Sequence, residues 1–354
     1  MKLEKAIKFK NGKKRNYEIG NIPVYGGNGI LGYTNNYNAE KNNIIIGRVG
    51  AYCGCVYRNN DECWISDNAI VGNVKEGFDY NFIYYLLKSI NLNSLHIGSS
   101  HPLMTQEILN NIEINIPAHD YQKRAAKILN IIDQKIELNI QTNDNLYKMM
   151  KIKFEDWITN LNKYEVSSLS KIANYTNGLA MQKFRPKDNE ESLPVIKIKE
   201  MNDGITENTE RCSTNIKDEV IINNGDVLFA WSGTLCMSIW GKGKAGLNQH
   251  IFKVTSDKYP KWFYYFWTLK HLNKFKMIAA GKATTMGHIK RGELDISEVL
   301  IPEDKELQEM HKIMQPLFNK YINNLIQNET LTQLRDTLLP KLMNGKINLD
   351  KIEI

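Results

Sequence analysis

The chain has 354 residues, a net charge of +7, 42% hydrophobic residues and 24% charged residues. This length favours two domains, or three when long helices are counted separately, and the composition is ordinary for a globular protein with a buried core. The amino terminus shows no apolar core of a signal peptide and no apolar run approaches transmembrane length, so we expect a cytoplasmic protein.

The first block of the chain, residues 1–117, opens with a strongly basic segment. Seven of its first fifteen residues are Lys or Arg, against one Glu. Such a segment favours a polyanionic partner, although a solvated surface would explain it as well. Short apolar runs separated by Gly, Asn and Pro then indicate strands, and an aromatic helix is expected at 80–90. Strands followed by a late helix predict an α+β domain.

A long amphipathic helix is predicted next, over residues 120–157. Its apolar residues recur at intervals of three and four, and polar Asn139 and Asn143 interrupt the stripe halfway along. A stripe of this length needs a partner, because most helical stability comes from packing the apolar face.

The second block, residues 162–302, repeats the organisation of the first. Residues 3–15 and 169–181 share Leu, Lys and an Asn-Gly turn at an offset of 166, and an aromatic helix is expected again at 261–274. Asn68 aligns with Asn248 as a shared turn residue. The cores differ in nearly every side chain, so the repeat predicts one task performed on two different targets.

A second long helix begins after residue 303, and an offset of 185 superposes the first helix on it without a gap. Chain order makes a pair of these helices antiparallel, and asparagines within its seam would select the register. The alternative is two unrelated surface helices, each packed on its own block. Pro316 predicts a kink, or a short helix at 304–315 ahead of the main one. The residues expected to form the seam are Ile128, Ile132, Asn139, Asn143, Leu146, Met149, Ile313, Leu317, Asn324, Asn328, Leu331 and Leu334.

Motifs for catalysis are missing from the sequence. No two prolines are adjacent, which removes the Asn/Asp-Pro-Pro-Tyr motif of adenine methyltransferases, and neither a nucleotide-binding P-loop, a G-x-S-x-G elbow nor an H-E-x-x-H helix occurs. The five cysteines form no C-x-x-C pair and suit a reducing compartment, and the spacing of Cys53, Cys55 and Cys63 disfavours zinc. We therefore expect a chain that recognises rather than reacts, with no catalytic, metal or cofactor-binding residues.

Two variable blocks, each followed by a repeated long helix, resemble the specificity subunits of type I restriction-modification systems. The phrases IPVYGGNGILGY, IIIGRVGAYCG, ISDNAIV, QKRAAKILNIIDQKIELN and LTQLRDTLLPKLMNGKI carry the same resemblance, which covers essentially the whole chain. It implies an α+β fold with two similar target recognition domains, separated by a pair of long antiparallel helices that form a coiled coil with an internal pseudo-two-fold repeat. The implied divisions are 1–117 and 162–302 for the domains, and 118–161 and 303–354 for the helices and the tail.

The resemblance also implies partners. These are double-stranded DNA with a target in two parts, two methylation subunits docked on the helices, and restriction subunits that bind through them. S-adenosylmethionine and ATP are then expected on the partner subunits and not on this chain. A helix of this length spans roughly 55 Å, so its length would set the unread gap between the two half-sites.

DNA contacts require cations for phosphates and hydrogen-bonding groups for base edges. Each candidate has a structural alternative: Tyr25 and Tyr33 could belong to the core, Trp231 could point inward, and His101 and His250 could be ordinary surface histidines. The candidates in the first block are Lys13, Lys14, Arg15, Tyr25, Asn28, Tyr33, Arg48, Tyr52, Ser99, Ser100 and His101. Those in the second are Lys183, Arg185, Lys197, Lys199, Trp231, Ser232, Thr234, Gln249, His250, Lys282, Thr284, Thr285 and His288.

Two other functions remain open from the sequence. A stand-alone DNA-binding protein would bind its site tightly without methylation subunits. A scaffold that binds only proteins would show no salt-dependent association with duplex DNA.

Overall fold

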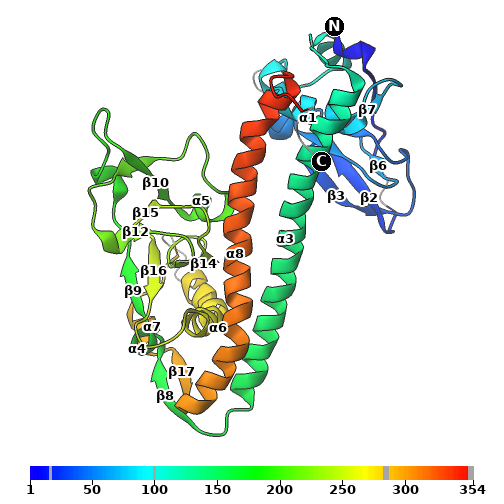
Figure 1. The fold of residues 1–354 in the computed structure, drawn as a ribbon. Coiled ribbons are helices and arrows are strands. Elements are labelled where there is room, and N and C mark those ends of the chain that lie inside the picture. Colours follow the sequence, from blue (N-terminus) through cyan, green and yellow to red (C-terminus); the bar gives the residue numbers. More distant parts are fainter. Residues whose placement is uncertain (16–17, 99–100, 282–286, 350–354) are drawn as a thin grey trace. The chain divides into compact units, whose positions relative to one another are not determined.

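The computed structural model describes residues 1–15, 18–98, 101–281 and 287–349 (Figure 1). The chain forms two compact units, one of Met1–Gln134 with Leu331–Ile354 and the other of Lys135–Thr330. Each unit contains one α+β domain together with one part of each long helix. We call the elements before the first long helix domain 1, and those between the two long helices domain 2.

Domain 1 is built on two small sheets. The first has the order β1-β7-β4-β5 with every pair antiparallel, and the second has the order β3-β2-β6 with β2 and β6 parallel. Buried Phe82 and Tyr85 of the helix α1 pack in the same core as Ile7 and Ile44 of the first sheet. The elements are η1 (Leu3–Lys5), β1 (Ile7–Asn11), β2 (Ile22–Gly26), β3 (Gly29–Thr34), β4 (Ile44–Gly47), η2 (Gly50–Tyr52), β5 (Val56–Arg58), β6 (Trp64–Ile65), β7 (Ala69–Val74), α1 (Tyr80–Ser89), η3 (Leu92–Leu95) and α2 (Gln106–Asn111).

Domain 2 repeats this plan with insertions. Its first sheet has the order β9-β16-β13-β14, and its second has the order β11-β10-β15-β12 with β10 and β15 parallel. The first elements are β8 (Tyr164–Ser168), α4 (Leu169–Ile172), β9 (Asn174–Asn177), η4 (Met181–Lys183), β10 (Ser192–Ile196), α5 (Ile198–Asp203), β11 (Arg211–Ser213), η5 (Asp218–Val220) and β12 (Ile221–Ile222). They are followed by β13 (Val227–Ala230), β14 (Cys236–Ile239), β15 (Ala245–Leu247), β16 (Ile251–Thr255), α6 (Lys261–Ala280), α7 (Gly292–Asp295) and β17 (Glu298–Pro302), which pairs with β8.

The Asn-Gly turn noted in the sequence has the same structural role in both domains. A Cβ on Gly12 would lie 2.0 Å from the carbonyl oxygen of Ser66, and one on Gly178 would lie 2.2 Å from that of Asn248. Glycine is required at both positions because the backbones approach too closely for any side chain. Corresponding strands and corresponding close approaches show that the two domains share one scaffold.

This shared scaffold corrects one alignment made from the sequence. Ser66, rather than Asn68, occupies the position of Asn248, since Lys13 bridges to Ser66 as Leu179 bridges to Asn248. Asn68 then corresponds to His250. The sequence alignment was wrong by two residues because it matched side-chain identity, whereas the backbone hydrogen bonds define the position.

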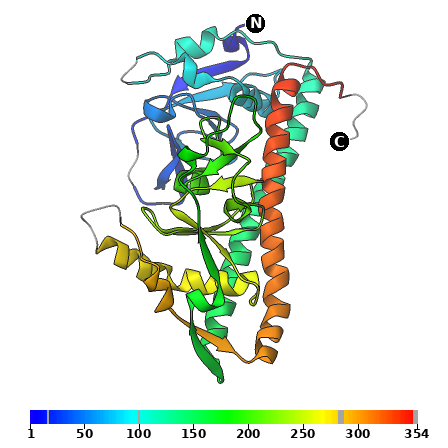
Figure 2. The same ribbon diagram turned by 90° about the vertical axis from the view of Figure 1, so that its left-hand side faces the viewer.

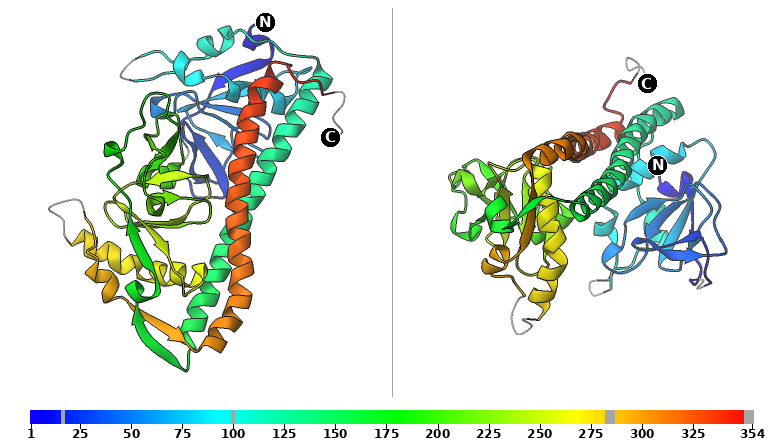
Figure 3. Two further views of the ribbon diagram at one scale, coloured as in Figure 1. Left: turned by 60° about the vertical axis from the view of Figure 1, so that its left-hand side comes forward. Right: turned by 90° about the horizontal axis from the view of Figure 1, so that it is seen from below.

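The long helices are α3 (His119–Thr159, 41 residues) and α8 (Asp304–Met343, 40 residues). Within each unit their segments run side by side and antiparallel (Figures 1 and 3). In the second unit Asn139 Nδ2 donates to Asn328 Oδ1 at 2.8 Å, and Asn324 Nδ2 donates to Asn143 Oδ1 at 2.9 Å. Adding 185 to 139 gives 324, and subtracting 185 from 328 gives 143, so the internal repeat relates these two bonds to each other.

The same symmetry governs two bonds from the asparagines to the helix backbone. Asn143 Nδ2 donates to the carbonyl of Tyr321 at 3.0 Å, and Asn328 Nδ2 donates to that of Ile136 at 3.3 Å. Asn139, Asn143 and Asn324 are buried, so unpaired amides would carry a desolvation cost there. The four bonds form only when the helices are aligned in this register. The asparagines therefore select the register of the helix pair.

The joints between each domain and its helix segments use different chemistry. In the second unit the ring of Phe266 on α6, the yellow helix of Figure 2, stacks on Phe154 of α3 at 5.4 Å and meets Phe318 of α8 at 6.4 Å. In the first unit Tyr85 donates to Asp133 at 2.7 Å, and Asp133 pairs with Arg335 at 3.1 Å. The aromatic joint thus relies on stacked rings, whereas the joint in the first unit adds a hydrogen bond and an ion pair to its apolar core.

Some sequence expectations for the helices need correction. Met149, Ile313 and Leu334 are exposed rather than in the seam, whereas Met150, Met314 and Phe318 are buried in the core of the second unit. A spacing of three and four residues does not fix the buried face to within one residue. Ile132 and Leu146 are buried, whereas Ile128, Leu317 and Leu331 are partly buried.

Pro316 does not interrupt α8, which is one helix from Asp304 to Met343. The residue is exposed, and so is Lys312 one turn earlier, whose carbonyl loses its usual backbone partner. Water can reach that carbonyl. The predicted separate helix at 304–315 is therefore wrong.

Candidate nucleic-acid interface

In domain 1, three loop segments meet beyond the end of β4. Arg48 N donates to the carbonyl of Asn68 at 2.9 Å, Met104 N donates to the carbonyl of Arg48 at 2.8 Å, and Gly50 N donates to that of Pro102 at 3.1 Å. These backbone bonds hold residues 48–50, 67–68 and 102–104 together. Loops fixed on a rigid scaffold in this way are where binding residues usually lie.

Arg48 is the principal cation of this region. Its guanidinium Nη1 donates to the carbonyl of Asp67 at 3.2 Å, which holds the side chain across the loop. Asp67 and Asn68 beside it are exposed. The arrangement presents a positioned guanidinium, a carboxylate and an amide, which together can read donors and acceptors on base edges.

Other sequence candidates of domain 1 surround this point or lie on the neighbouring β2–β3 hairpin. Asn28 is exposed at the hairpin turn and accepts a bond from the Tyr57 hydroxyl at 3.5 Å. Tyr33 is 59% exposed and Tyr52 is 48% exposed, so both rings are available to a partner. Tyr25 is half-buried against the core of the second sheet, and burial raises the pKa of its hydroxyl, so its expected role as a contact is weakened.

The basic residues of domain 1 continue this surface. Lys13 and Lys14 are exposed, and Lys14 offers its backbone carbonyl to Trp64 at 3.2 Å. Arg15 donates to the carbonyl of Leu31 at 3.2 Å, which ties it to the β2–β3 hairpin. His101 is exposed next to the 102–104 segment.

In domain 2 the corresponding region is aromatic. The Trp231 ring lies 6.1 Å from the His250 ring and 6.3 Å from the His288 ring. Within the described part of the chain, Trp231 Nε1 and His250 Nδ1 are buried and have no hydrogen-bond partner. Gln249 Nε2 lies 3.3 Å from His250 Nε2, so the amide is held beside the imidazole.

The remaining candidates of domain 2 are more dispersed. Lys183, Arg185 and Lys199 are exposed, whereas Lys197 pairs with Glu210 at 2.6 Å and loses part of its capacity for phosphate. Thr234 is exposed. Ser232 is only 5% exposed and its backbone forms the bridge to His288, which weakens the expectation that it contacts DNA. Five further candidates lie outside the described residues: Ser99, Ser100, Lys282, Thr284 and Thr285.

Sequence reasoning missed Asp67 and Leu103, and it assigned Asn68 to a structural turn. Only the strand-to-loop hydrogen bonds bring these positions beside Arg48, and no local motif signals them. The sequence does show that Arg48 and Trp231 both follow a short apolar run, and aligning these two residues would have located the loop in both domains.

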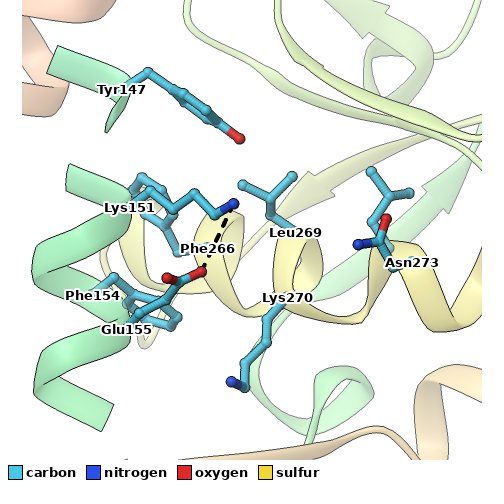
Figure 4. A pocket seen from close by; sticks show the side chains of 9 residues that line it. Tyr147, Lys151, Phe154, Glu155, Phe266, Leu269, Lys270 and Asn273 are labelled. Atoms are coloured by element: carbon cyan, nitrogen blue, oxygen red, sulfur yellow. Dashed lines mark ion pairs between the residues drawn. The ribbon is translucent and has the colours of Figure 1, made fainter. Parts of the chain in front are cut away.

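A separate hollow of about 410 Å³ lies between α3 and α6 (Figure 4). Phe154 and Phe266 form part of its wall, and the Lys151–Glu155 ion pair of 3.8 Å crosses its rim. Its apolar wall belongs to the aromatic joint described above. It contains none of the residues expected to contact DNA.

Two further searches concern the described residues only. No group of three or more His, Cys, Asp or Glu side chains in that part of the chain is arranged to hold a metal ion. None of its helices combines the length and the hydropathy needed to cross a membrane.

Comparisons with known proteins agree with this architecture. The family model described as type I restriction modification DNA specificity domain matches residues 3–148 and 162–333. A type I restriction enzyme specificity subunit of Methanocaldococcus jannaschii is 24% identical over 315 residues, which cover 78% of this chain and 71% of that protein. The HindI specificity subunit of Haemophilus influenzae is 21% identical, covering 71% and 72% of the two chains. The crystal structure of a type I S subunit from M. genitalium aligns over 97% of this chain and 95% of that one, with 16% identity and a TM-score of 0.66.

Proposed function

The chain belongs to the family of type I restriction-modification DNA specificity domains, and we propose that its two domains read the two halves of a divided DNA target. It is a specificity subunit, the non-catalytic component of such an enzyme. The methylation and cleavage chemistry then resides in partner subunits, which use S-adenosylmethionine and ATP. We propose that it binds duplex DNA and works in the cytoplasm.

One observation carries the proposal of a divided target. The first sheets of the two domains have the same strand order and the domains share the same backbone close approaches, yet their loops present Arg48 and Asn68 in one and Trp231, Gln249 and His250 in the other. A shared scaffold with different hydrogen-bonding groups is what two half-sites of different sequence require.

We further propose that methylation subunits dock on α3. Leu138, Met149 and Ile152 are 55%, 39% and 66% exposed, and helical spacing places them on one side of the helix, away from the asparagine seam. Exposed apolar groups gathered on one side of a helix are typical of a protein-binding surface. The charged side chains that follow them in sequence, Lys151 and Lys153, would form the polar rim.

The test is to purify the tagged chain from its native host and to map methylated adenines in strains with and without the gene. We expect a methyltransferase to co-purify, and the methylated sites to consist of two short fixed blocks separated by a constant gap. Replacing residues 162–302 by the corresponding block of a relative should alter one fixed block only. Alteration of both blocks, or the absence of any gene-dependent methylation, would contradict the proposal.

A further inference from the structure

The loops that follow β4 and β13 are held by the same set of backbone hydrogen bonds. In domain 2, Trp231 N donates to the carbonyl of His250 at 3.2 Å, Ile289 N to that of Trp231 at 3.1 Å, and Gly233 N to that of Gly287 at 2.8 Å. The domain 1 bonds have the same donors and acceptors at equivalent positions: 48 with 231, 68 with 250, 104 with 289, 50 with 233, and 102 with 287.

Two more features confirm that the frames coincide. Val49 bridges Leu103 as Ser232 bridges His288, both antiparallel. Gly50 has φ of 74° and Gly233 has φ of 72°, so the same left-handed turn follows in each domain. Glycine is the residue that adopts this conformation without strain. The backbone is therefore held constant over three segments that are distant in sequence.

The side chains carried by this constant frame differ completely. We define the readout patch as Arg48, Asp67, Asn68 and Leu103 in domain 1, and as their equivalents Trp231, Gln249, His250 and His288 in domain 2. All eight residues are exposed or partly exposed. Residues that support the frame, such as Ser66 and Asn248, are buried.

Resting on the proposed function, we propose that the readout patch contains the base-contacting, specificity-determining residues of each half-site. Arg48 is assigned to guanine, because a guanidinium can donate two bonds to O6 and N7 in the major groove. Gln249 is assigned to adenine, because a carboxamide matches the N6 and N7 edge. Each half-site would then contain a base whose identity depends on one of these side chains.

The remaining groups of the patch position these two readers. The carbonyl of Asp67 holds the Arg48 guanidinium at 3.2 Å, and the His250 imidazole lies 3.3 Å from the Gln249 amide. The Trp231 ring lies 6.1 Å from the His250 ring and 6.3 Å from the His288 ring, so the three rings are grouped beside the Gln249 amide. A side chain held in advance loses less conformational entropy on binding, which favours discrimination between bases.

The test uses the full chain assembled with the methylation subunits of its host, and a library of duplexes randomised at the two half-sites. Methylated products are sequenced for the wild type and for Arg48→Ala, Arg48→Lys and Gln249→Ala. Lys5→Ala and Lys171→Ala are matched controls, because both lysines are exposed and lie outside the patch. Thermal unfolding of each variant verifies that it is folded.

We expect Arg48→Ala and Arg48→Lys to relax a guanine preference by about tenfold or more at one position of one half-site. Gln249→Ala should relax an adenine preference in the other half-site. Lysine retains the charge but lacks the rigid planar fork of the guanidinium, so a guanine preference lost in Arg48→Lys separates base reading from phosphate binding. Unchanged preferences, or weaker methylation that is uniform across sequences, would overturn this inference while leaving the proposed function intact. A wild type without any two-part preference would overturn both.

Discussion

Cys63 is buried in domain 1, and burial raises the pKa of its thiol to about 12, although a bond from the Asn59 side chain opposes the shift. Only the thiolate reacts with alkylating agents. At pH 8 we therefore expect Cys63 to be modified far more slowly in the native protein than in urea, as measured by peptide mass spectrometry. The native rate should rise as the pH increases toward 12.

Cys55 provides the control, because it is only partly buried in the same domain. It should be modified in the native protein at a rate closer to its rate in urea. Equal native rates for Cys55 and Cys63 would contradict the prediction.

At the residue scale, the sequence predicted which kinds of side chain form the helix seam better than it predicted which residue numbers are buried. The asparagines of the helix repeat were identified from their offset of 185 and lie where the hydrogen bonds form. Met149 was chosen in place of buried Met150, because two adjacent methionines satisfy the same periodicity nearly equally well. Asp67 could not be found at all, since its position depends on contacts between loops that are distant in the chain.

At the scale of elements, the pairing of α3 with α8 depends on hydrogen bonds between buried asparagines. Asn143→Leu alone leaves the buried Asn324 amide without its acceptor, which we expect to lower the free energy of unfolding by about 2 kcal/mol. The double variant Asn143→Leu with Asn324→Leu removes both polar groups together. It should be less destabilised than the sum of the two single variants, or even more stable than the wild type.

Urea unfolding of the two single variants and the double variant measures this coupling. Asn145→Leu is the control, because Asn145 is exposed on the same helix and its replacement should change stability by no more than about 0.5 kcal/mol. Strict additivity of the two seam substitutions would show that the amides do not act as a pair.

Secondary structure was predicted most successfully for long, periodic segments. Expected helices at 120–157 and 80–90 correspond to α3 and α1 within a few residues. The break expected at Pro316 failed because one proline on a solvated face costs less than the packing of forty residues contributes. Short strands such as β6 and β12, with two residues each, have no periodicity from which they could be predicted.

At the scale of the whole molecule, α3 starts in one unit and ends in the other, so its length should influence the target. We predict the effect of inserting seven residues before Asn139 in α3 and seven after Asn328 in α8. Seven residues make nearly two turns, so the seam keeps its face, and they add about 10.5 Å of helix. At about 3.4 Å per base pair, the unread gap should lengthen by about three base pairs with both half-sites unchanged.

Mapping of methylated adenines measures the gap. Glu137→Ala with Thr330→Ala is the control, because it alters exposed residues near the same places without changing helix length. An unchanged gap in the insertion variant would show that helix length does not set the spacing.

The symmetry of the asparagine seam has an evolutionary consequence. Each of the four asparagine bonds described above has an image generated by exchanging the two helices, so this part of the seam is self-complementary in the way that a two-fold dimer interface is. An ancestor half this long could have used the same four bonds to associate with its own copy and would have recognised a palindrome. Fusion of the two genes would free each half to change its base preference independently, which converts a symmetric target into an asymmetric one.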